Sequence, residues 1–336
     1  MNQKSNVMNT SKMNAIVATG YGATDVLQFR TVDRPQPKSN EVLVRVVATT
    51  ATTADAMMRT GKPYIGRLFL GLTKPKSPIP GTGFAGYIEQ VGKEVHNFQV
   101  GDAVFGLTTL GFGANAEYLT IPETGVILPK PDNLGFAVAA SYGDGHLTSF
   151  NFLKQVAKVS AGQSVLINGA SGSLGTSAIQ LAKYLGAEVT AVCSGKNAGL
   201  VKSLGADTVI DYTKEDFTQC GQKFDFVFDA VGKSSFRQCK PILNKNGVYL
   251  SPVMKFSLLA QMLLTRFFGS KKARFEATGL NADPVLRNLL SEVLRIHQAG
   301  KLKTVIDRQF PLARLAEAHG YIDSGHKVGN VIIMNA

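Results

Sequence analysis

The sequence is poor in cysteine, and it lacks tryptophan and any long apolar run. Its three cysteines, Cys193, Cys220 and Cys239, are scattered and form no Cys-x-x-Cys pair, which excludes the disulfide framework of a small secreted protein. No apolar run reaches the ~18 residues that cross a bilayer, and the polar N-terminus has no apolar signal-peptide core. We therefore expect a cytoplasmic protein, because a reducing compartment is usual for a chain with so few cysteines.

The formal charge of the chain is strongly positive, +12 at neutral pH, with a pI near 9.5. Basic proteins often bind nucleic acid, anionic membranes or anionic cofactors. Lysine and arginine occur along the whole chain, and the densest group, Lys271, Lys272 and Arg274, is too short for a basic nucleic-acid-binding arm. We expect no dedicated nucleic-acid or membrane partner, and the alternative is an enzyme whose surface is simply basic.

Length and hydrophobic pattern predict two domains in the 336 residues. After a flexible leader over residues 1–12, short β-branched runs separated by proline and glycine predict a β-rich domain over residues 13–137. Apolar strands then alternate with helical segments over residues 138–281, which predicts βαβ units and a parallel sheet. A helix capped by Asp283 and ended by Gly300 precedes further strands, so we expect residues 282–336 to rejoin the first domain. The fold class is α/β, with a doubly wound parallel sheet and a β-rich domain.

A glycine-rich turn connects the predicted strand 164–168 to the helix predicted over 176–185. Its sequence, Gly-Ala-Ser-Gly-Ser-Leu-Gly over residues 169–175, is the dinucleotide-binding fingerprint with Ala170 at the first glycine position. Gly172 would let the backbone approach a pyrophosphate, and Gly175 would let helix and strand pack closely. Amide groups at the helix start would then meet the anion. The turn predicts a bound dinucleotide, and the alternative is a structural turn in another doubly wound fold.

The residues after the second strand of this unit indicate which dinucleotide binds. NAD-binding proteins carry Asp or Glu there to hold the ribose, but this chain has Cys193. Ser194 and Asn197 can donate hydrogen bonds to a 2′-phosphate, Lys196 supplies charge, and no carboxylate at this position repels it. We therefore expect NADPH, with a solvated Lys196 at a helix start as the alternative. We interpret Cys193 as a small buried apolar residue.

Longer motifs resemble a known family. They lie at residues 81–92, 100–106, 168–175, 180–183, 204–212 and 327–331. These stretches resemble the medium-chain dehydrogenase/reductases, and specifically the zinc-independent, zeta-crystallin-like quinone oxidoreductase branch, over nearly everything from Met13 to Met334. The resemblance implies a split, GroES-like substrate domain around a Rossmann domain, with the active site in the cleft between them. It implies the following cofactor-binding residues: Thr148, Ser171, Gly172, Ser173, Leu174, Gly175, Ser194, Lys196, Tyr212 and Lys327. Within this set, Thr148 would lie near the nicotinamide, and Lys327 is a further candidate for the 2′-phosphate.

The resemblance also bears on zinc. Zinc-dependent relatives carry Gly-His-Glu where this chain has Gly81-Thr82-Gly83, and they place a ligand cysteine near residues 52–55, where this chain has none. Three cysteines cannot supply a four-cysteine zinc lobe, and the remaining histidines lack ligand spacing. We expect no metal. Without a Lewis acid the oxidation of simple alcohols is poorly supported, so the resemblance implies hydride transfer from NADPH to a quinone or an α,β-unsaturated carbonyl.

Three residues are candidates for the catalytic cleft. Thr52 takes a position where relatives often have asparagine, and Tyr64 lies in a region where some relatives have a site tyrosine. His146 is a candidate proton donor near neutral pH, in a segment whose residues 144–146 depart from the family pattern. The alternatives are strand packing for Thr52, a surface position for Tyr64 and a structural role for His146.

The apolar segment 256–268, which ends near the basic group, has two interpretations. It predicts either a membrane-surface helix or, as the resemblance implies, a segment that covers the cofactor cleft near a dimer contact. We favour the second and expect a homodimer through residues 274–280. Two other functions stay open: a broader NADP-dependent alkenal or carbonyl reductase, and an NADPH-binding protein with little turnover that engages RNA or a membrane.

Overall fold

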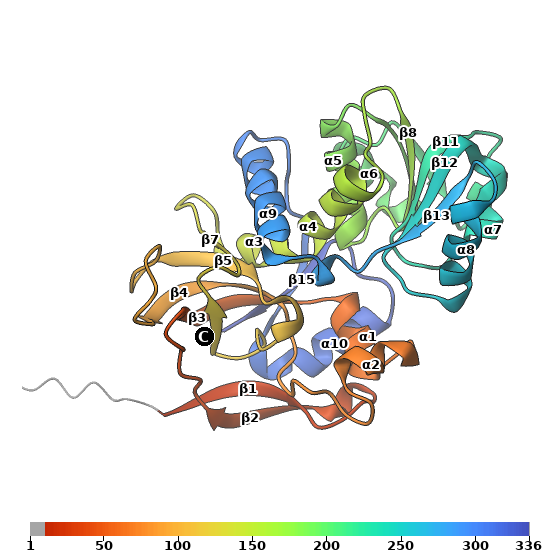
Figure 1. Cartoon of the computed structure of the whole chain (residues 1–336). Helices are drawn as coiled ribbons and strands as arrows, with labels where there is room; N and C mark the ends of the chain where they lie inside the picture. The colour runs from red at the N-terminus through yellow and green to blue at the C-terminus, as the bar shows by residue number, and fades with distance from the viewer. Residues whose placement is uncertain (1–10, 336) are drawn as a thin grey trace, which may run out of the picture.

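The computed structural model describes residues 11–335 as two large sheets joined by helices, with a two-stranded ribbon beside them (Figure 1). The leader predicted over residues 1–12 lies outside the described residues except for Ser11 and Lys12, and Lys12 already begins β1 (Lys12–Ala18). β1 pairs antiparallel with β2 (Leu27–Asp33) to form the ribbon. Among residues 11–335 there is no helix whose length and hydropathy would let it cross a bilayer.

A six-stranded parallel sheet forms one half of the molecule. Its strands are β8 (Ser164–Asn168), β9 (Glu188–Cys193), β10 (Thr208–Asp211), β11 (Phe224–Asp229), β12 (Leu243–Ser251) and β13 (Lys272–Phe275). Their order is β10-β9-β8-β11-β12-β13, so the direction of winding reverses between β8 and β11. The predicted parallel sheet is confirmed, and its edge strand β13 overlaps the segment 274–280 through which a homodimer is expected. The pairing of β12 with β11 contains a register shift, which lies between Leu243 and Val248 on β12.

The helices of this half follow its strands. They are α5 (Ser173–Tyr184), α6 (Ala198–Ser203), α7 (Phe236–Cys239) and α8 (Phe256–Phe267). α5 begins directly after the glycine-rich turn, three residues earlier than predicted, and buries Ile179, Leu181 and Ala182 against the sheet. It ends where predicted, because Gly186 adopts the left-handed backbone (φ 83°) that closes a helix.

The second large sheet is mostly antiparallel. It orders β14 (Ile306–Pro311), β15 (Asn330–Met334), β3 (Glu41–Ala51), β4 (Gly83–Val91), β5 (Ala103–Leu107) and β7 (Val126–Pro129), and β6 (Tyr118–Pro122) also pairs with β3. β15 pairs antiparallel with β3, so the last of the described strands joins the same sheet as the strands before residue 130. The predicted domain boundaries at residues 137/138 and 281/282 stay a prediction.

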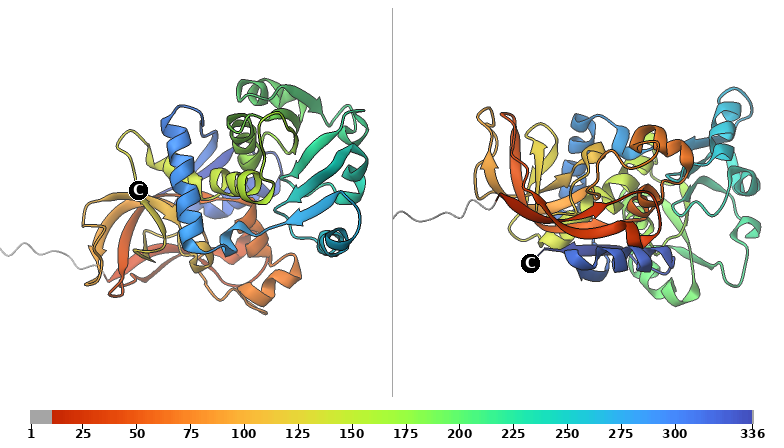
Figure 2. Two further views of the ribbon diagram at one scale, coloured as in Figure 1. Left: turned by 45° about the horizontal axis from the view of Figure 1, so that its top comes forward. Right: turned by 90° about the horizontal axis from the view of Figure 1, so that it is seen from below.

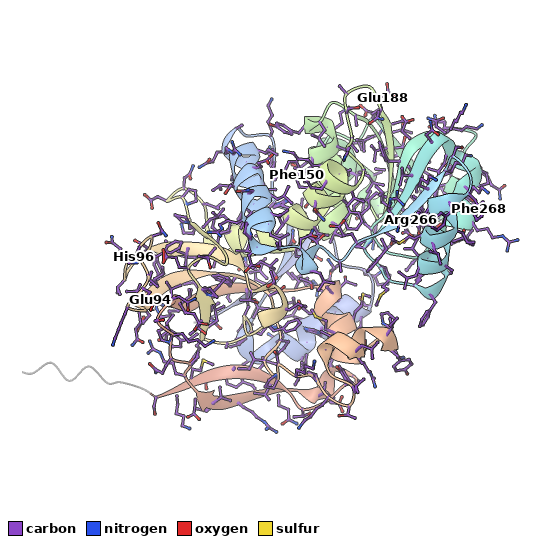
Figure 3. The ribbon with its side chains drawn as sticks, viewed as in Figure 1. Glu94, His96, Phe150, Glu188, Arg266 and Phe268 are labelled. Carbon is purple, nitrogen blue, oxygen red and sulfur yellow. The ribbon has the colours of Figure 1, made fainter. Side chains whose placement is uncertain are left out.

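Helices join the two sheets. α3 (Phe136–Ala140), α4 (Gly145–Phe150) and α9 (Asp283–Gln298) lie between them, whereas α1 (Thr53–Thr60), α2 (Arg67–Leu70) and α10 (Leu315–Asp323) lie on the far side of the second sheet (Figures 1 and 2). One buried core runs from Phe105 through Phe150 to Ile167, and Phe150 is visible at this junction in Figure 3. Asp283 is the first residue of α9 rather than its cap, since Ala282 holds that position. The shared core fixes how the two halves face each other.

Close packing of β5 against β7 gives the first testable prediction. A Cβ atom on Gly106 would lie 2.0 Å from the carbonyl oxygen of Val126, a contact that only backbone movement can relieve. We expect Gly106→Ala to lower the free energy of unfolding by about 1–3 kcal/mol, measured by urea denaturation. Gly320→Ala is the matched control, because its Cβ meets nothing within 4 Å in α10, and it should be neutral or stabilising by up to about 1 kcal/mol. Equal stability of the Gly106 variant and the wild type would contradict the prediction.

Candidate functional site

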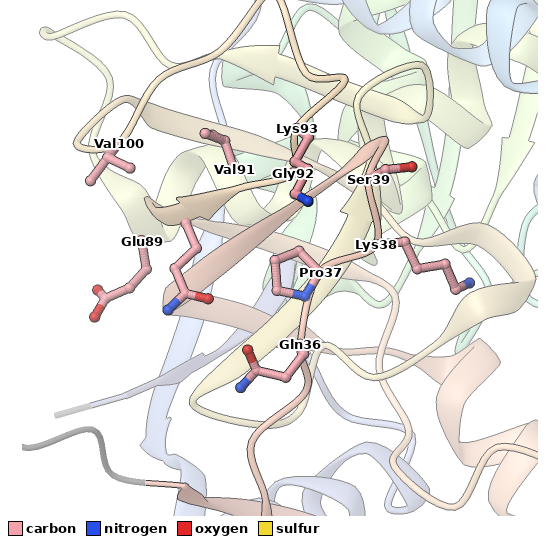
Figure 4. Close-up of a pocket in the computed structure, with 10 residues that line it drawn as sticks. Gln36, Pro37, Lys38, Ser39, Glu89, Val91, Gly92, Lys93 and Val100 are labelled. Carbon is pink, nitrogen blue, oxygen red and sulfur yellow. The ribbon is translucent and has the colours of Figure 1, made fainter.

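A pocket of about 630 Å³ lies at one end of the second sheet, between the segment around Pro37 and the end of β4 (Figure 4). Its lining residues, among them Lys38, Glu89 and Lys93, include none of the predicted site residues. In doubly wound sheets ligands bind instead at the carboxyl ends of the strands, where the winding reverses. The candidate site is therefore built from the turn after β8.

Two glycines give this turn its shape. Gly169 adopts φ 81°, and a Cβ there would lie 2.5 Å from Val231 Cγ1. A Cβ on Gly175 would lie 2.2 Å from the carbonyl oxygen of Gly169, so α5 packs directly on the turn. Gly172 differs, because its Cβ would meet only the Gly169 carbonyl at 3.5 Å. The backbone is therefore open at Gly172, which leaves room for a phosphate to approach.

The start of α5 has the features of an anion-binding helix N-terminus. Gly172 is its N-cap, and no side chain among residues 11–335 caps the first turn, so the amides of Ser173 and Leu174 remain available. Gly329 holds the turn from outside, because its amide donates to the Ser171 carbonyl at 2.8 Å. These residues fit the diphosphate of a dinucleotide, as the sequence predicts.

Lys327 lies beside this helix start. Its Nζ donates to the carbonyl oxygen of Gly329 at 3.1 Å. Asp144 also reaches the helix, since its Oδ2 accepts a hydrogen bond from Ser173 Oγ at 2.9 Å. Burial raises the pKa of Asp144 and lowers the pKa of Lys327, while the attraction between the two charges opposes both shifts. These contacts place Lys327 near the diphosphate position, and its predicted role at the 2′-phosphate stays a prediction.

The predicted 2′-phosphate residues gather at the ends of β9 and β10. Cys193 pairs with Asp211 in the sheet, so the next residues, Ser194 and Tyr212, follow side by side. The Lys196 side chain is exposed in the same turn. Asn197 Nδ2 donates to Ser171 Oγ at 3.0 Å and so joins this turn to the glycine-rich turn. The structure brings these residues together, and their contact with a phosphate stays a prediction.

One carboxylate nevertheless reaches this turn. A Cβ on Gly195 would lie 2.4 Å from Asp211 Oδ2. Asp211 therefore lies beside the turn after β9, in which the sequence has no acidic residue. The Asp211 carboxylate accepts hydrogen bonds from the Thr213 hydroxyl (2.7 Å) and amide (3.0 Å), which lower its pKa. This charge comes from the neighbouring strand β10, so the residues that follow β9 in the sequence do not reveal it.

Asp229, at the end of β11, is a second residue that sequence reasoning missed. It is fully buried, and its carboxylate accepts hydrogen bonds from Asn168 Nδ2, the Gly232 and Ser234 amides, and Tyr249 Oη, all within 3.0 Å. These donors come from β8, from the turn after β11 and from β12. Asp229 therefore fixes the edge of the sheet at which a dinucleotide would lie, and an acidic residue at the end of an apolar strand was its signal in the sequence.

Thr52 is buried and caps α1. Its Oγ1 donates to Asp55 Oδ2 at 2.7 Å and accepts from the Asp55 amide at 3.0 Å. The other oxygen of Asp55 has no partner among the described residues, and burial raises the pKa of Asp55 to about 7, with a smaller contribution from Asp144. Thr52 thus has a structural role, and the ionisable group next to it is Asp55.

His146 is enclosed by neighbouring side chains. It is buried, its Nδ1 lies 2.8 Å from Ser177 Oγ and its Nε2 lies 2.7 Å from Thr304 Oγ1. Burial lowers its pKa to about 3, so the imidazole is neutral at physiological pH. The proton-donor hypothesis is therefore replaced by a structural role, because both ring nitrogens are engaged.

The third cleft candidate, Tyr64, and the predicted cofactor-binding residue Thr148 differ in their surroundings. Tyr64 is 65% exposed, with the Arg67 guanidinium 4.8 Å from its ring centre. Thr148 lies one turn after Asp144 in α4, to whose carbonyl oxygen its amide donates. Asp144 binds the start of α5, so Thr148 shares a helix face with a residue that touches the phosphate turn. This placement supports Thr148 more than Tyr64, whose site role stays a prediction.

Zinc does not fit the donor groups that residues 11–335 present. Within the described range, no three His, Cys, Asp or Glu side chains gather in a way that could hold a metal ion. Cys193 and Cys239 are buried in different apolar cores. We therefore assign no step to a metal.

Comparison with known proteins shows clear relatives. The family pattern of the alcohol dehydrogenase GroES-like domain matches residues 38–132, and that of the zinc-binding dehydrogenases matches residues 204–333. A 2-methylene-furan-3-one reductase of Solanum lycopersicum and a chloroplastic NADPH-dependent alkenal/one oxidoreductase of Arabidopsis thaliana are each 32% identical, over 96% of this chain and 79% of theirs. The structure of the quinone oxidoreductase from Coxiella burnetii superposes with a TM-score of 0.86 at 28% identity, covering 96% of this chain and 99% of that one.

The buried Asp55 predicts a pH-dependent stability difference. Its folded pKa of about 7 exceeds the ordinary value of 3.8, so ionisation costs the folded state free energy as pH rises through that window. Asp55→Asn keeps an oxygen for the Thr52 hydroxyl and removes this cost. The free energy of unfolding of the variant, relative to wild type, should rise by roughly 2–4 kcal/mol between about pH 4 and pH 8.

A second variant should change its stability relative to wild type in the opposite direction as pH rises. The Thr218 amide lowers the pKa of Asp216, so that carboxylate stabilises the fold above its unfolded pKa. Asp216→Asn should therefore lose stability relative to wild type as pH rises from acid to neutral. If the free energy of unfolding of Asp55→Asn differed from that of wild type by the same amount at every pH, the raised pKa of Asp55 would be refuted.

Proposed function

The chain belongs to the medium-chain dehydrogenase/reductase superfamily, in its zeta-crystallin-like quinone oxidoreductase branch, and we propose that it is a zinc-independent reductase of quinones and α,β-unsaturated carbonyls that uses NADPH. The observation that carries this proposal is the uncapped start of α5 behind the open Gly172, at the point where the sheet reverses its winding. NADPH, when bound there, would supply a hydride from its nicotinamide ring.

The residues of this chain would bind and orient the cofactor. The amides of Ser173 and Leu174 would hold its diphosphate, with Lys327 as a nearby positive charge. Ser194, Lys196 and Tyr212 would surround the 2′-phosphate at the other end. A relative that is named NADPH-dependent supports this choice of dinucleotide.

The acceptor follows from the donor groups that the chain lacks. Gly81-Thr82-Gly83 offers no zinc ligand, so no Lewis acid would polarise an unactivated carbonyl or stabilise an alkoxide. A quinone or enone is already electron-poor and accepts hydride without such help. The relatives named quinone oxidoreductase and alkenal/one oxidoreductase support these two acceptor classes. The broader alkenal or carbonyl reductase is the alternative.

The enzyme's setting stays a prediction. A cytoplasmic location follows from the cysteine content alone, whereas the Arabidopsis relative is named chloroplastic. Direct strand pairing is the simplest contact for the homodimer predicted through residues 274–280, and the surroundings of β13 argue against it. β13 is an edge strand, but α8 covers its outer amides: Ala273 donates to Thr265 Oγ1 (3.1 Å) and Phe275 to Met262 Sδ (3.1 Å).

An acceptor screen with metal analysis tests the proposed reaction. We expect the purified chain to oxidise NADPH with 1,4-benzoquinone and with 2-alkenals, to hold far less than one zinc ion per chain, and to keep its activity after chelation. Faster turnover of alkenals than of quinones would favour the broader reductase. Stoichiometric zinc, or tight NADPH binding without turnover on any acceptor, would contradict the proposal.

Lys196 tests the choice between the two dinucleotides. Lys196→Ala would remove a charge-assisted contact with the 2′-phosphate. NADH has no 2′-phosphate, so its binding should not depend on this contact. The KM for NADPH should rise about 5- to 100-fold, as expected for 1–3 kcal/mol, with the KM for NADH nearly unchanged. Lys202→Ala, on an exposed position of α6, is the matched control and should change neither. Equal losses with both dinucleotides would show that Lys196 does not contact the phosphate.

A further inference from the structure

The net positive charge of the chain is concentrated in one stretch, although basic residues occur throughout. Residues 230–275 contain nine lysines and arginines and no acidic residue, whereas the other 290 residues hold 27 basic and 24 acidic residues. This stretch includes α7, β12, α8 and β13, which form the outer end of the parallel sheet (Figure 1). Most of the net charge is therefore carried by one end of the molecule.

Helix α8 lies on this end with two different faces. Its inner face packs on β13 through Leu258, Met262 and Thr265. Its outer face exposes large apolar side chains, each more than half accessible: Phe256, Leu263, Leu264, Phe267 and the following Phe268. Arg266 and Phe268 are labelled near α8 in Figure 3. Exposed apolar side chains gathered on one element indicate an interaction surface.

Beside the end of α8 lies a pocket of about 370 Å³ with apolar walls and cationic groups. Phe236, Leu264 and Phe268 line it together with Lys240 and Lys271. The pKa of Lys271 is lowered, first by burial and then by the positive charges of Lys223 and Lys240. Lysines that repel one another, with no acidic residue in the whole stretch, form a site complementary to an anion.

We propose that this end of the molecule docks on the surface of an anionic phospholipid bilayer. The outer face of α8 would enter the boundary between headgroups and acyl chains, as a basic amphipathic helix does. Lys240 and Lys271 would meet a lipid phosphate at the pocket. The apolar and the cationic features lie on the same element and its neighbour, which is the combination that such a surface recognises.

Charge argues against a second copy of the chain as the occupant. A symmetric contact would bring nine uncompensated positive charges against nine more, and like charges across an interface oppose association. Strand pairing at this end is blocked as well, because α8 side chains bind the outer amides of β13. Single-stranded nucleic acid would contact the cations and stack on the aromatic rings, but it would not bury the exposed Leu263 and Leu264.

Vesicle co-sedimentation of the full chain tests the proposal. We expect binding to vesicles of mixed phosphatidylcholine and phosphatidylglycerol at low salt, weaker binding at high salt, and little binding to phosphatidylcholine alone. The double variant Phe267→Ser/Phe268→Ser should bind about tenfold or more weakly. Lys240→Gln/Lys271→Gln should bind about fivefold more weakly for each charge removed.

Matched controls come from the other end of the molecule. Val100 and Lys93 are also an exposed apolar and an exposed basic residue, and Val100→Ser/Lys93→Gln should bind vesicles as the wild type does. Circular dichroism should be unchanged in all three variants, which shows that each remains folded. The vesicle assay needs no turnover, so an inactive but folded chain tests docking independently of the proposed reaction.

Three results would overturn the proposal. Absence of binding to anionic vesicles at low salt is the first. Sedimentation velocity that shows a dimer, which the Phe267→Ser/Phe268→Ser variant dissociates, would show that this face joins two copies. Binding to single-stranded RNA that is tighter than to vesicles and unaffected by loss of the phenylalanines would identify nucleic acid as the partner.

Discussion

A single buried carboxylate, that of Asp229, holds the functional edge of the parallel sheet in place. A buried carboxylate is tolerated only when donors surround it, and Asp229 has four, from β8, from β12 and from the turn after β11. Because one of them is Asn168, the last residue of β8, the same network fixes where the glycine-rich turn begins. The open backbone at Gly172 and the free amides of α5 depend on that starting point.

The electrostatics of the molecule separate two binding tasks. At the start of α5, backbone amides would attract a phosphate, and the two nearby charges, Asp144 and Lys327, have opposite signs and shift each other's pKa in opposing directions. At the far end of the sheet, the basic residues around α8 have no acidic residue among them. The first arrangement suits one defined ligand held by geometry, whereas the second suits an extended anionic surface held by many weak contacts.

The candidate site was predictable where it depends on local sequence. The strand, the glycine turn and the helix are adjacent in the chain, so their spacing alone placed residues 171–175 correctly at the junction between β8 and α5, and their contact with a phosphate stays a prediction. The proton-donor hypothesis for His146 failed because its protonation depends on burial between Ser177 and Thr304, and Thr304 is 158 residues away. Asp211 was overlooked for a similar reason, since the neighbouring strand β10 brings it beside Gly195.

The sequence by itself determined the class of fold, the dinucleotide-binding turn and the family, because periodicity and motif spacing are properties of short continuous segments. Only the tertiary structure decided which ionisable groups are buried, that Thr52 is occupied with capping α1, and that α8 covers the edge of β13 while its apolar outer face stays exposed. Burial, protonation and exposure depend on what the rest of the chain places around a residue, and contacts between distant segments determine that environment.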